Sequence, residues 1–357
     1  YPFLAFVQKE FFHILRDSRT MLILLGIPIV QIILFGFAIT TEVKNGRVAV
    51  MDLSNDIATL QLKERLAWSE YFTVTNNVGS TNEINQLFQE GKIDLAIVFE
   101  NRFDQEWKRT GSPSCQIITD TTDPNSGQMM AMYAQMVMFN TTENSMIMSQ
   151  MMYNPGMKGA YNFVPGVMAL ILLLICAMMT SISIVREKER GTMEILLVSP
   201  IRPIYIVIAK MVPYFFLSVI NLTTILILSF FVLEVPIAGS LIQLIIFSLL
   251  YIVVGLALGL LISTLAATQV SAMLISGMVL MMPVIWFSGM MFPIENMPIP
   301  LQYLSTLLPA RWYLAGIKKI MIQGLDITYA WRELLVLAAM ATGLIVVSIK
   351  KFSNKLS

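Results

Sequence analysis

Residues 186–200 read Arg-Glu-Lys-Glu-Arg-Gly-Thr-Met-Glu-Ile-Leu-Leu-Val-Ser-Pro and lie between two long apolar runs. The first nine of these residues carry six charges. Because charges this dense cannot lie in hydrocarbon, the stretch must be a water-facing loop between two membrane spans. Its basic residues place the loop on the cytoplasmic side of the membrane.

The second half of this loop has the pattern of a short amphipathic helix. Gly191 is expected to end the upstream helix, and Thr192 can cap a new one. Glu194 then lies in the first turn, where a carboxylate suits the helix dipole, and Pro200 stops the element. One face of this helix would be apolar and would consist of Met193, Leu196 and Leu197. Such a face suits a groove on a partner protein, and the alternative is a loop that only sets topology.

The composition is that of an integral membrane protein. Of 357 residues, 56% are hydrophobic and only 13% are charged, whereas a soluble domain has about 25% charged residues. The net charge of +1 gives no electrostatic case for binding nucleic acid. Two cysteines provide no disulfide framework, since Cys115 lies in a polar region and Cys176 in an apolar run.

The apolar runs predict six spans, because about 20 apolar residues cross a bilayer. The 60 uncharged residues between Glu234 and Glu295 are too many for one span and fit two. The last run, Leu334–Ile349, is short and is expected to extend through Trp331 with Arg332 snorkelling. The predicted order is a cytoplasmic interfacial amphipathic helix 1–19, span one 20–41, an extracytoplasmic domain 42–159, span two 160–185, the cytoplasmic segment 186–200, span three 203–233, span four 238–262, span five 270–290, an extracytoplasmic re-entrant or interfacial segment 291–330, span six 331–349 and a cytoplasmic tail 350–357.

Residues 42–159 differ from the rest of the chain, with 14 acidic and 9 basic residues. Strand-like and helix-like runs alternate here, which predicts a compact α/β domain inserted into an α-helical polytopic membrane protein. The predicted strands are Arg47–Leu53, Tyr71–Thr75, Ile93–Phe99 and Cys115–Asp120. The predicted helices are Ile57–Glu70, Thr81–Glu90 and 124–152. In span four, Gly255 and Gly259 are expected to permit close helix contact.

Methionine is concentrated near the end of this domain. Ten methionines lie between residues 129 and 157: Met129, Met130, Met132, Met136, Met138, Met146, Met148, Met151, Met152 and Met157. Ordinary helix packing is the first interpretation, a surface for hydrophobic substrates the second, and copper(I) binding the third.

Motifs for energy conversion are absent from the sequence. The only Gly-Lys, Gly91-Lys92, lacks the upstream glycine of a phosphate-binding loop, and no HExxH or CxxC occurs. An ion-driven carrier would be expected to bury Asp or Glu within its spans, and no such residue lies mid-span. The chain is therefore predicted not to be an enzyme and to hold no metal or cofactor itself.

Three stretches resemble the ABC type-2 exporter permeases. The strongest is Glu187-Lys-Glu-Arg-Gly-Thr-Met-Glu-Ile-Leu-Leu-Val-Ser-Pro200, which is similar to the coupling segment of that family. The pairs Lys9-Glu10 and Arg16-Asp17, and the stretch Ser288–Pro298, also resemble family patterns. The resemblance covers essentially the whole chain, and the large domain after span one is typical of the drug- and lipid-efflux subgroup.

The resemblance implies roles for two sets of residues. In the family the coupling segment contacts the ATP-binding subunit, which implies an ATPase-coupling set: Glu187, Glu189, Arg190, Gly191, Thr192, Glu194, Leu196, Leu197 and Pro200. Spans two and five flank the family's central path, which implies a translocation set: Met178, Met179, Met281, Met282, Trp286 and Phe287.

The resulting functional prediction is the permease subunit of an ATP-binding cassette exporter that moves drug-like molecules or lipids outward. ATP and magnesium would bind to a separate ATPase subunit. Further predicted partners are a second permease copy, identical or related, a periplasmic adaptor protein and the lipid bilayer. The predicted location is the bacterial inner membrane with both termini cytoplasmic. The alternative is a membrane-anchored sensor or assembly protein that uses residues 42–159 as a binding module.

Overall fold

The computed structural model describes residues 2–16, 18–38, 46–110, 115–119, 124–139, 154, 158–191 and 203–354. The chain divides into two compact units, residues 1–40 with 159–357, and residues 41–158. Within the described residues, five helices are long and apolar enough to cross a membrane, and the second unit holds a small mixed sheet. The coarser part of the fold prediction, a mostly helical membrane protein with a small α/β region, is confirmed.

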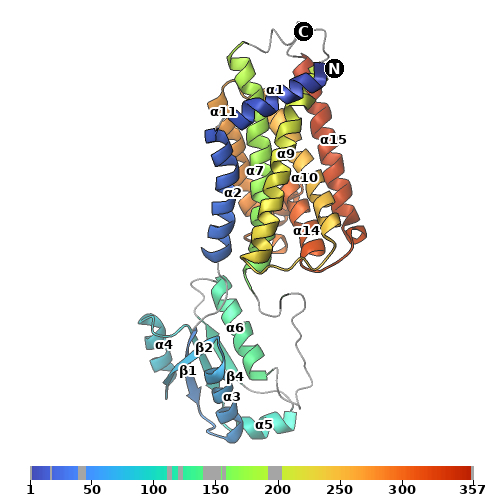
Figure 1. Cartoon of the computed structure of the whole chain (residues 1–357). Helices are drawn as coiled ribbons and strands as arrows, with labels where there is room; N and C mark the ends of the chain where they lie inside the picture. The colour runs from blue at the N-terminus through green and yellow to red at the C-terminus, as the bar shows by residue number, and fades with distance from the viewer. Residues whose placement is uncertain are drawn as a thin grey trace. The chain divides into compact units, whose positions relative to one another are not determined.

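The first unit is helical (Figure 1). Its elements are α1 (Pro2–Arg16), α2 (Ser18–Ala38), α7 (Ala160–Glu189), α9 (Pro203–Phe231), α10 (Leu241–Leu265), α11 (Gln269–Leu274), the π-helical turn η1 (Ile275–Val279), α12 (Leu280–Phe287), η2 (Ile294–Asn296), α13 (Ile299–Ser305), α14 (Pro309–Met321), η3 (Ile327–Ala330) and α15 (Trp331–Asn354). The five span-length helices are Ala160–Glu189, Ile208–Phe231, Leu241–Leu265, Gln269–Phe287 and Ile327–Lys351, and α2 adds the shorter apolar stretch Leu24–Leu34.

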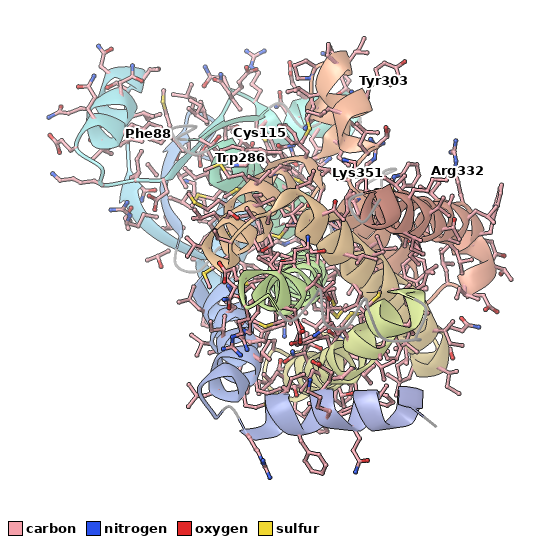
Figure 2. The ribbon with its side chains drawn as sticks, turned by 90° about the horizontal axis from the view of Figure 1, so that it is seen from above. Phe88, Cys115, Trp286, Tyr303, Arg332 and Lys351 are labelled. Atoms are coloured by element: carbon pink, nitrogen blue, oxygen red, sulfur yellow. The ribbon has the colours of Figure 1, made fainter. Side chains whose placement is uncertain are left out.

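Helix α7 lies in the middle of this unit when the bundle is viewed end-on (Figure 2). Of its most apolar window, 78% is buried, against 17% for the helix Gln269–Phe287. Side chains on nearly every face of α7 are therefore packed against other helices, which makes α7 the core element. Helix α1 lies across the ends of α7 and α9, at the same end of the bundle as the end of α15 (Figure 1).

Helix α14 belongs to the segment that the sequence predicts to be re-entrant or interfacial. Its Tyr313 is fully buried and stacks on Tyr251 of α10, with ring centroids 4.0 Å apart. The Tyr313 hydroxyl is 2.8 Å from Ser248 Oγ, and the Tyr251 hydroxyl donates to the carbonyl of Ala169 in α7 at 2.9 Å. These buried hydroxyls are satisfied, so α14 is fixed within the bundle through α10 and α7.

Span five differs in detail from the prediction, and the helix of span six continues past the predicted residue 349 to Asn354. The predicted continuous helix 270–290 contains a π-helical turn at Ile275–Val279 and ends at Phe287. Ser276 within the turn donates to the carbonyl of Ala272 at 2.6 Å, a local bond that competes with regular helix geometry. Helix α15 begins at Trp331, as predicted, and the exposed Arg332 points away from the bundle (Figure 2).

The second unit is an α/β fold. Its elements are β1 (Gly46–Asp52), α3 (Ile57–Trp68), β2 (Phe72–Asn77), α4 (Thr81–Gln89), β3 (Leu95–Phe99), α5 (Phe103–Thr110), β4 (Cys115–Thr119) and α6 (Pro124–Phe139). The strand order is β2-β1-β3-β4, with β1 parallel to β2 and β3, and β4 antiparallel to β3. The four strands lie where the sequence predicts them, whereas α5 was not predicted. The predicted helix 124–152 is described only as far as residue 139.

Helices cover both faces of this sheet. Val48 and Val50 of β1 pack with α3, α5 and α6, and Ala49 and Met51 pack with α4 on the other face. Of the ten clustered methionines, Met129, Met130, Met136 and Met138 pack against the first of these cores. No group of His, Cys, Asp or Glu within the described residues could hold a metal ion.

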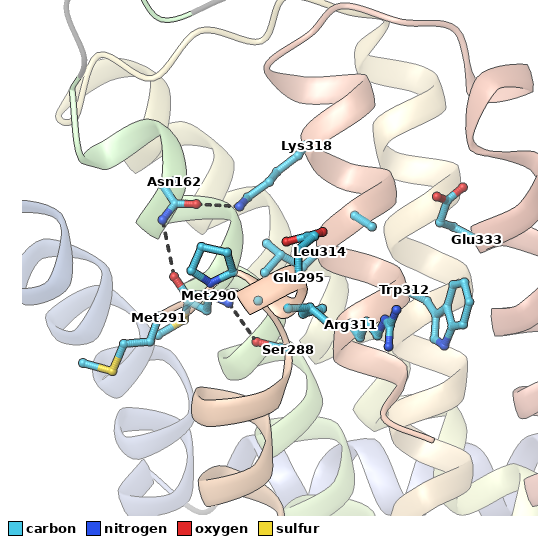
Figure 3. A pocket seen from close by; sticks show the side chains of 14 residues that line it. Asn162, Ser288, Met290, Met291, Glu295, Arg311, Trp312, Leu314, Lys318 and Glu333 are labelled. Atoms are coloured by element: carbon cyan, nitrogen blue, oxygen red, sulfur yellow. Dashed lines mark hydrogen bonds between the residues drawn. The ribbon is translucent and has the colours of Figure 1, made fainter. Parts of the chain in front are cut away.

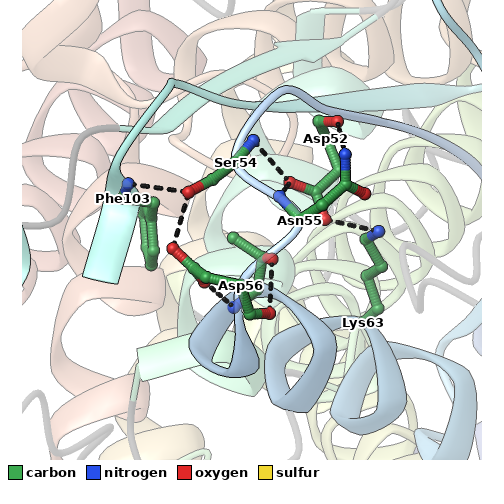
Figure 4. Close-up of polar contacts among 7 residues, drawn as sticks. Asp52, Ser54, Asn55, Asp56, Lys63 and Phe103 are labelled. Atoms are coloured by element: carbon green, nitrogen blue, oxygen red, sulfur yellow. Dashed lines mark hydrogen bonds and ion pairs between the residues drawn. The ribbon is translucent and has the colours of Figure 1, made fainter. Parts of the chain in front are cut away.

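The loop after β1 is held by a closed set of polar contacts (Figure 4). Asp56 caps α3 by accepting from the amide of Thr59 at 2.9 Å, and it also accepts from the amide of Asp104 in α5 at 2.8 Å. Burial acts to raise the pKa of the Asp56 carboxyl, but hydrogen bonds from Ser54, Thr59 and Asp104 hold this pKa below its usual value. One carboxylate thus fixes the first turns of two helices, which is a structural role.

Close packing of α10 on α7 depends on two glycines, as the sequence predicts. A Cβ added at Gly255 would lie 2.7 Å from Cys176 Cβ, and one added at Gly259 would lie 2.5 Å from the carbonyl oxygen of Ala177. Both distances are far below van der Waals contact, so a side chain at either position would push the helices apart.

Replacing Gly259 with alanine should therefore destabilise the protein. Overpacking of this kind costs about 1–3 kcal/mol, because the obstructing atom is backbone and cannot rotate away. Gly343→Ala is the matched control, since nothing lies within 4 Å of an added Cβ there. Thermal unfolding of the purified protein in detergent checks both variants. An unchanged midpoint for Gly259→Ala would show that the α7–α10 contact is looser than described.

Candidate functional site at the charged end of the bundle

The end of α7 is set by the switch from apolar to charged residues. Residues 160–185 contain no charged side chain, and charges begin at Arg186. The amide of Arg190 donates to the carbonyl of Arg186 at 3.1 Å, and Gly191 adopts a φ of +67°. This left-handed conformation favours glycine and terminates the helix, so α7 ends where the sequence predicts.

A buried ion trio joins α1, α7 and α9. The ammonium group of Lys210 in α9 lies 3.2 Å from Glu10 Oε1 in α1 and 3.0 Å from Glu187 Oε1 in α7. Lys210 is 2% exposed and Glu10 is 6% exposed. A charge this deeply buried is tolerated only when it is paired, so the middle of α1, the end of α7 and the first part of α9 are held at fixed positions relative to one another.

A second set of contacts joins the end of α7 to the turn between α10 and α11. Arg186 Nε donates to Gln269 Oε1 at 3.1 Å, and the amide of Gln269 donates to Glu189 Oε1 at 2.8 Å. The Gln269 side chain also donates to Glu189, and Lys188 donates to the carbonyl of Ser263. Hydrogen bonds from the Gln269 side chain and backbone lower the pKa of the Glu189 carboxyl, which is therefore ionised at neutral pH.

The structure describes part of the predicted ATPase-coupling set. Glu187 and Glu189 have partners within the chain, while Arg190 and Gly191 are exposed at the end of the helix. The remaining members lie outside the described residues: Thr192, Glu194, Leu196, Leu197 and Pro200. The segment 192–200 is thus flanked directly by α7 and α9, the two helices that Lys210 joins.

The predicted translocation set is not brought together on one surface. Met178 packs toward α11 and η1 with Ala272 and Ile275, whereas Met179 packs with residues of α1, α2 and α9. On α12, Met281, Met282 and Trp286 are 37%, 64% and 48% exposed, and Phe287 is half-buried. Within one chain, the exposed members of the set therefore come from α12 alone.

Glu10, Lys210 and Gln269 belong to this site but were not predicted from the sequence as parts of it. A usable signal was present for Lys210, because a lysine beside a long apolar run needs an acidic partner. The identity of that partner could not be read from spacing, since Glu10 lies 200 positions away.

Comparisons with known proteins agree with this architecture. Residues 19–350 match the family described as ABC-2 family transporter protein. The chain is 33% identical over 341 residues to the probable multidrug ABC transporter permease YbhR of Escherichia coli K12, covering 92% of each chain. It is 28% identical over 333 residues to the probable multidrug ABC transporter permease YbhS of the same organism, covering 90% of this chain and 88% of that one. Over 370 residues it is 23% identical to ABC transporter G family member 20 of Dictyostelium discoideum, covering 98% of this chain and 50% of that protein.

Replacing Lys210 with methionine should destabilise the bundle, because it removes the shared cation from the buried carboxylate of Glu10 and the partly buried carboxylate of Glu187. Breaking a buried pair in this way costs about 3–5 kcal/mol, whereas Lys210→Arg keeps the charge and should cost less. Lys351→Met removes an exposed lysine from α15 and serves as the control. Thermal unfolding of the purified protein is the measurement. Equal midpoints for the Lys210→Met and Lys351→Met variants would exclude a structural role for the trio.

Proposed function

The chain belongs to the ABC-2 family of transporter proteins, and we propose that it exports amphipathic drug-like or lipid molecules as one of two membrane subunits driven by a separate ATPase. As a permease subunit of a multidrug-type ABC transporter, it relies on a partner ATPase. The names of the relatives YbhR and YbhS support a drug-like substrate. This family membership leaves the sensor interpretation without support.

The observation that carries the coupling proposal is the ion trio of Glu10, Glu187 and Lys210. Helix α7 precedes the segment 192–200 and α9 follows it, and Lys210 joins the two helices. A push on that segment would therefore move both helices together. Helix α7 is packed on nearly every face, so displacement of its end is passed to the core rather than absorbed locally. The ATPase would supply that push on ATP binding.

The exposed apolar face of the span Gln269–Phe287 supports the presence of a second permease copy. Only 17% of its apolar window is buried within one chain. The most exposed side chains on it are Val270, Met278, Val279 and Met282, each more than 60% exposed. We propose that this face meets the other permease and that Met281, Met282 and Trp286 line the path between the two copies. We propose α2 as the first of six spans.

The coupling segment provides the test of this function. Glu194→Ala should insert normally and lose transport, because removing one member of a desolvated interface pair costs about 2–5 kcal/mol. Leu196→Asp should release the ATPase, since it places a charge in an apolar groove. Lys351→Asp, a charge change on the exposed face of α15, is the control. Permease expression, ATPase co-purification and efflux are measured for each variant. If both test variants keep full transport and still co-purify with the ATPase, the segment only sets the membrane topology and does not couple the two subunits.

We propose that residues 42–159 lie on the extracytoplasmic side of the membrane and that the end of α7 lies on the cytoplasmic side. The reason is that the short charged loop after α7 is rich in Lys and Arg. Glu64→Cys in α3 should react with an impermeant maleimide in intact cells, whereas Arg190→Cys should react only after permeabilisation. The unmodified protein is the background control, since Cys176 is buried and burial raises the pKa of the Cys115 thiol to about 11. Labelling of Arg190→Cys in intact cells would show that the topology is the reverse of the one proposed.

A further inference from the structure

A cavity of about 380 Å³ opens beside α14 at the end of α7 far from the ion trio. Asn162 lines it, and Asn162 is separated from Glu187 by about 38 Å of helix. The other lining residues that matter here are Glu295, Arg311, Lys318 and Glu333, with Met290 and Trp312 as apolar walls (Figure 3). The volume lies within the range of about 300–1,000 Å³ typical of ligand pockets.

One of the lining residues, Glu333, has a buried carboxylate oxygen without a partner among the described residues. Glu333 is 6% exposed, and its Oε1 accepts from Lys319 at 2.7 Å. Across the described part of the chain, no donor reaches Glu333 Oε2. A buried carboxylate oxygen without a donor is costly, so the site calls for a group that brings an N–H or O–H.

The cations Arg311 and Lys318 line the same cavity, and both have more N–H donors than their hydrogen bonds described here require. Arg311 donates to the carbonyl of Gln302 at 2.8 Å and to Ser305, and Lys318 donates to Asn162 Oδ1. A guanidinium has five N–H donors and an ammonium has three, so each keeps donors to offer. Burial lowers the pKa of Lys318, and the charge of Glu295, which lines the same cavity, opposes this shift.

The charges favour an anion that also carries a donor. Lys319, which does not line the cavity, pairs with Glu333, so the two lining cations Arg311 and Lys318 are opposed by one remaining lining carboxylate, Glu295. An anionic group would take the spare donors of Arg311 and Lys318. A positively charged N–H group would then satisfy Glu333 Oε2.

The surroundings of the cavity are those of a membrane interface. Phe292, Tyr303 and Trp331 lie on the segments around it and are 39%, 72% and 62% exposed. Large exposed aromatic side chains gather at the headgroup level of a bilayer. A ligand at this level is supplied by the membrane itself.

We propose that this cavity binds the headgroup of a phospholipid that carries both a phosphate and a primary amine, with the phosphate on Arg311 and Lys318 and the ammonium on Glu333 Oε2. The proposal concerns a lipid site within one chain and does not depend on the transported substrate or on the ATPase. Phosphatidylethanolamine has this chemistry. Phosphatidylcholine is the matched control ligand, because it has the same phosphate and positive charge but no N–H donor.

The test is native mass spectrometry of the delipidated full-length protein with either lipid at equal concentration and equal acyl chains. Phosphatidylethanolamine should be retained about tenfold more than phosphatidylcholine, as expected for one charge-assisted hydrogen bond. Ala315→Leu narrows the cavity without removing a charge and should abolish this preference. Ala339→Leu, at an exposed position of α15, should keep it.

Glu333→Gln should reduce the preference toward parity while leaving phosphate-dependent binding, because it removes the charge that attracts the ammonium. If the Glu333→Gln variant does not fold, the lipid preference of the Ala315→Leu variant still tests the proposal. Equal retention of the two lipids by the unmodified protein, or an unchanged preference in Ala315→Leu, would overturn the proposal. Soluble glycerophosphoethanolamine that binds as well as the lipid would overturn the assignment to a membrane lipid.

Discussion

The pairing of one buried ammonium group with two carboxylates is the constraint on which the charged end of the bundle depends. In a chain that is 56% hydrophobic, Lys210 is 2% exposed and must have its counter-charges in place. Glu10 and Glu187 supply them from α1 and α7. Desolvation makes such a group costly when unpaired, so the interaction specifies position more than it adds stability. Phe11 of α1 packs on Phe216 of α9 with ring centroids 5.8 Å apart, which holds the same two elements by apolar contact.

From this end, a contiguous set of contacts follows α7 through the bundle. Gly255 and Gly259 bring α10 against α7, and Tyr251 then bonds to the Ala169 carbonyl and stacks on Tyr313 of α14. At the far end of α7, Asn162 meets Lys318 of α14. Helix α7 is thus held by polar groups at both ends and by close apolar packing between them. We expect a displacement at one end to be passed toward the other, because closely packed elements deform little.

Much of this fold could be predicted from the sequence, because run length and periodicity are local signals. Apolar runs located the long helices, alternation located the four strands, and Gly191 marked the end of α7. Helix α5 was missed because Phe103–Thr110 is short and mostly polar, and its first turn is fixed by Asp56 from a distant loop. The π-helical turn η1 was missed because it lies within a long uncharged run, where Ser276 and Gly277 are also common in regular membrane helices.

The candidate site was harder to predict, since its contacts join residues far apart in sequence. Periodicity can place Met178 and Met179 on one helix, but consecutive residues point in directions about 100° apart, and only packing shows that they meet different neighbours. The Lys210 trio and the cavity beside α14 also arise from tertiary contacts, Glu10 to Lys210 and Asn162 to Lys318.

The two helices proposed to flank the path have opposite mechanical properties. Helix α7 is buried and continuous over 30 residues, with Pro165 near its start, so we expect the part after Pro165 to move as a rigid body. The span Gln269–Phe287 is mostly exposed within one chain and contains a π-helical turn, a break in regular α-helix geometry that is frequent at functional sites. The turn lies beside Met178 of α7, since a Cβ on Gly277 would sit 3.5 Å from its Cε. We therefore expect movement of α7 to act on the π-helical turn at this contact, in the span proposed to face the second copy.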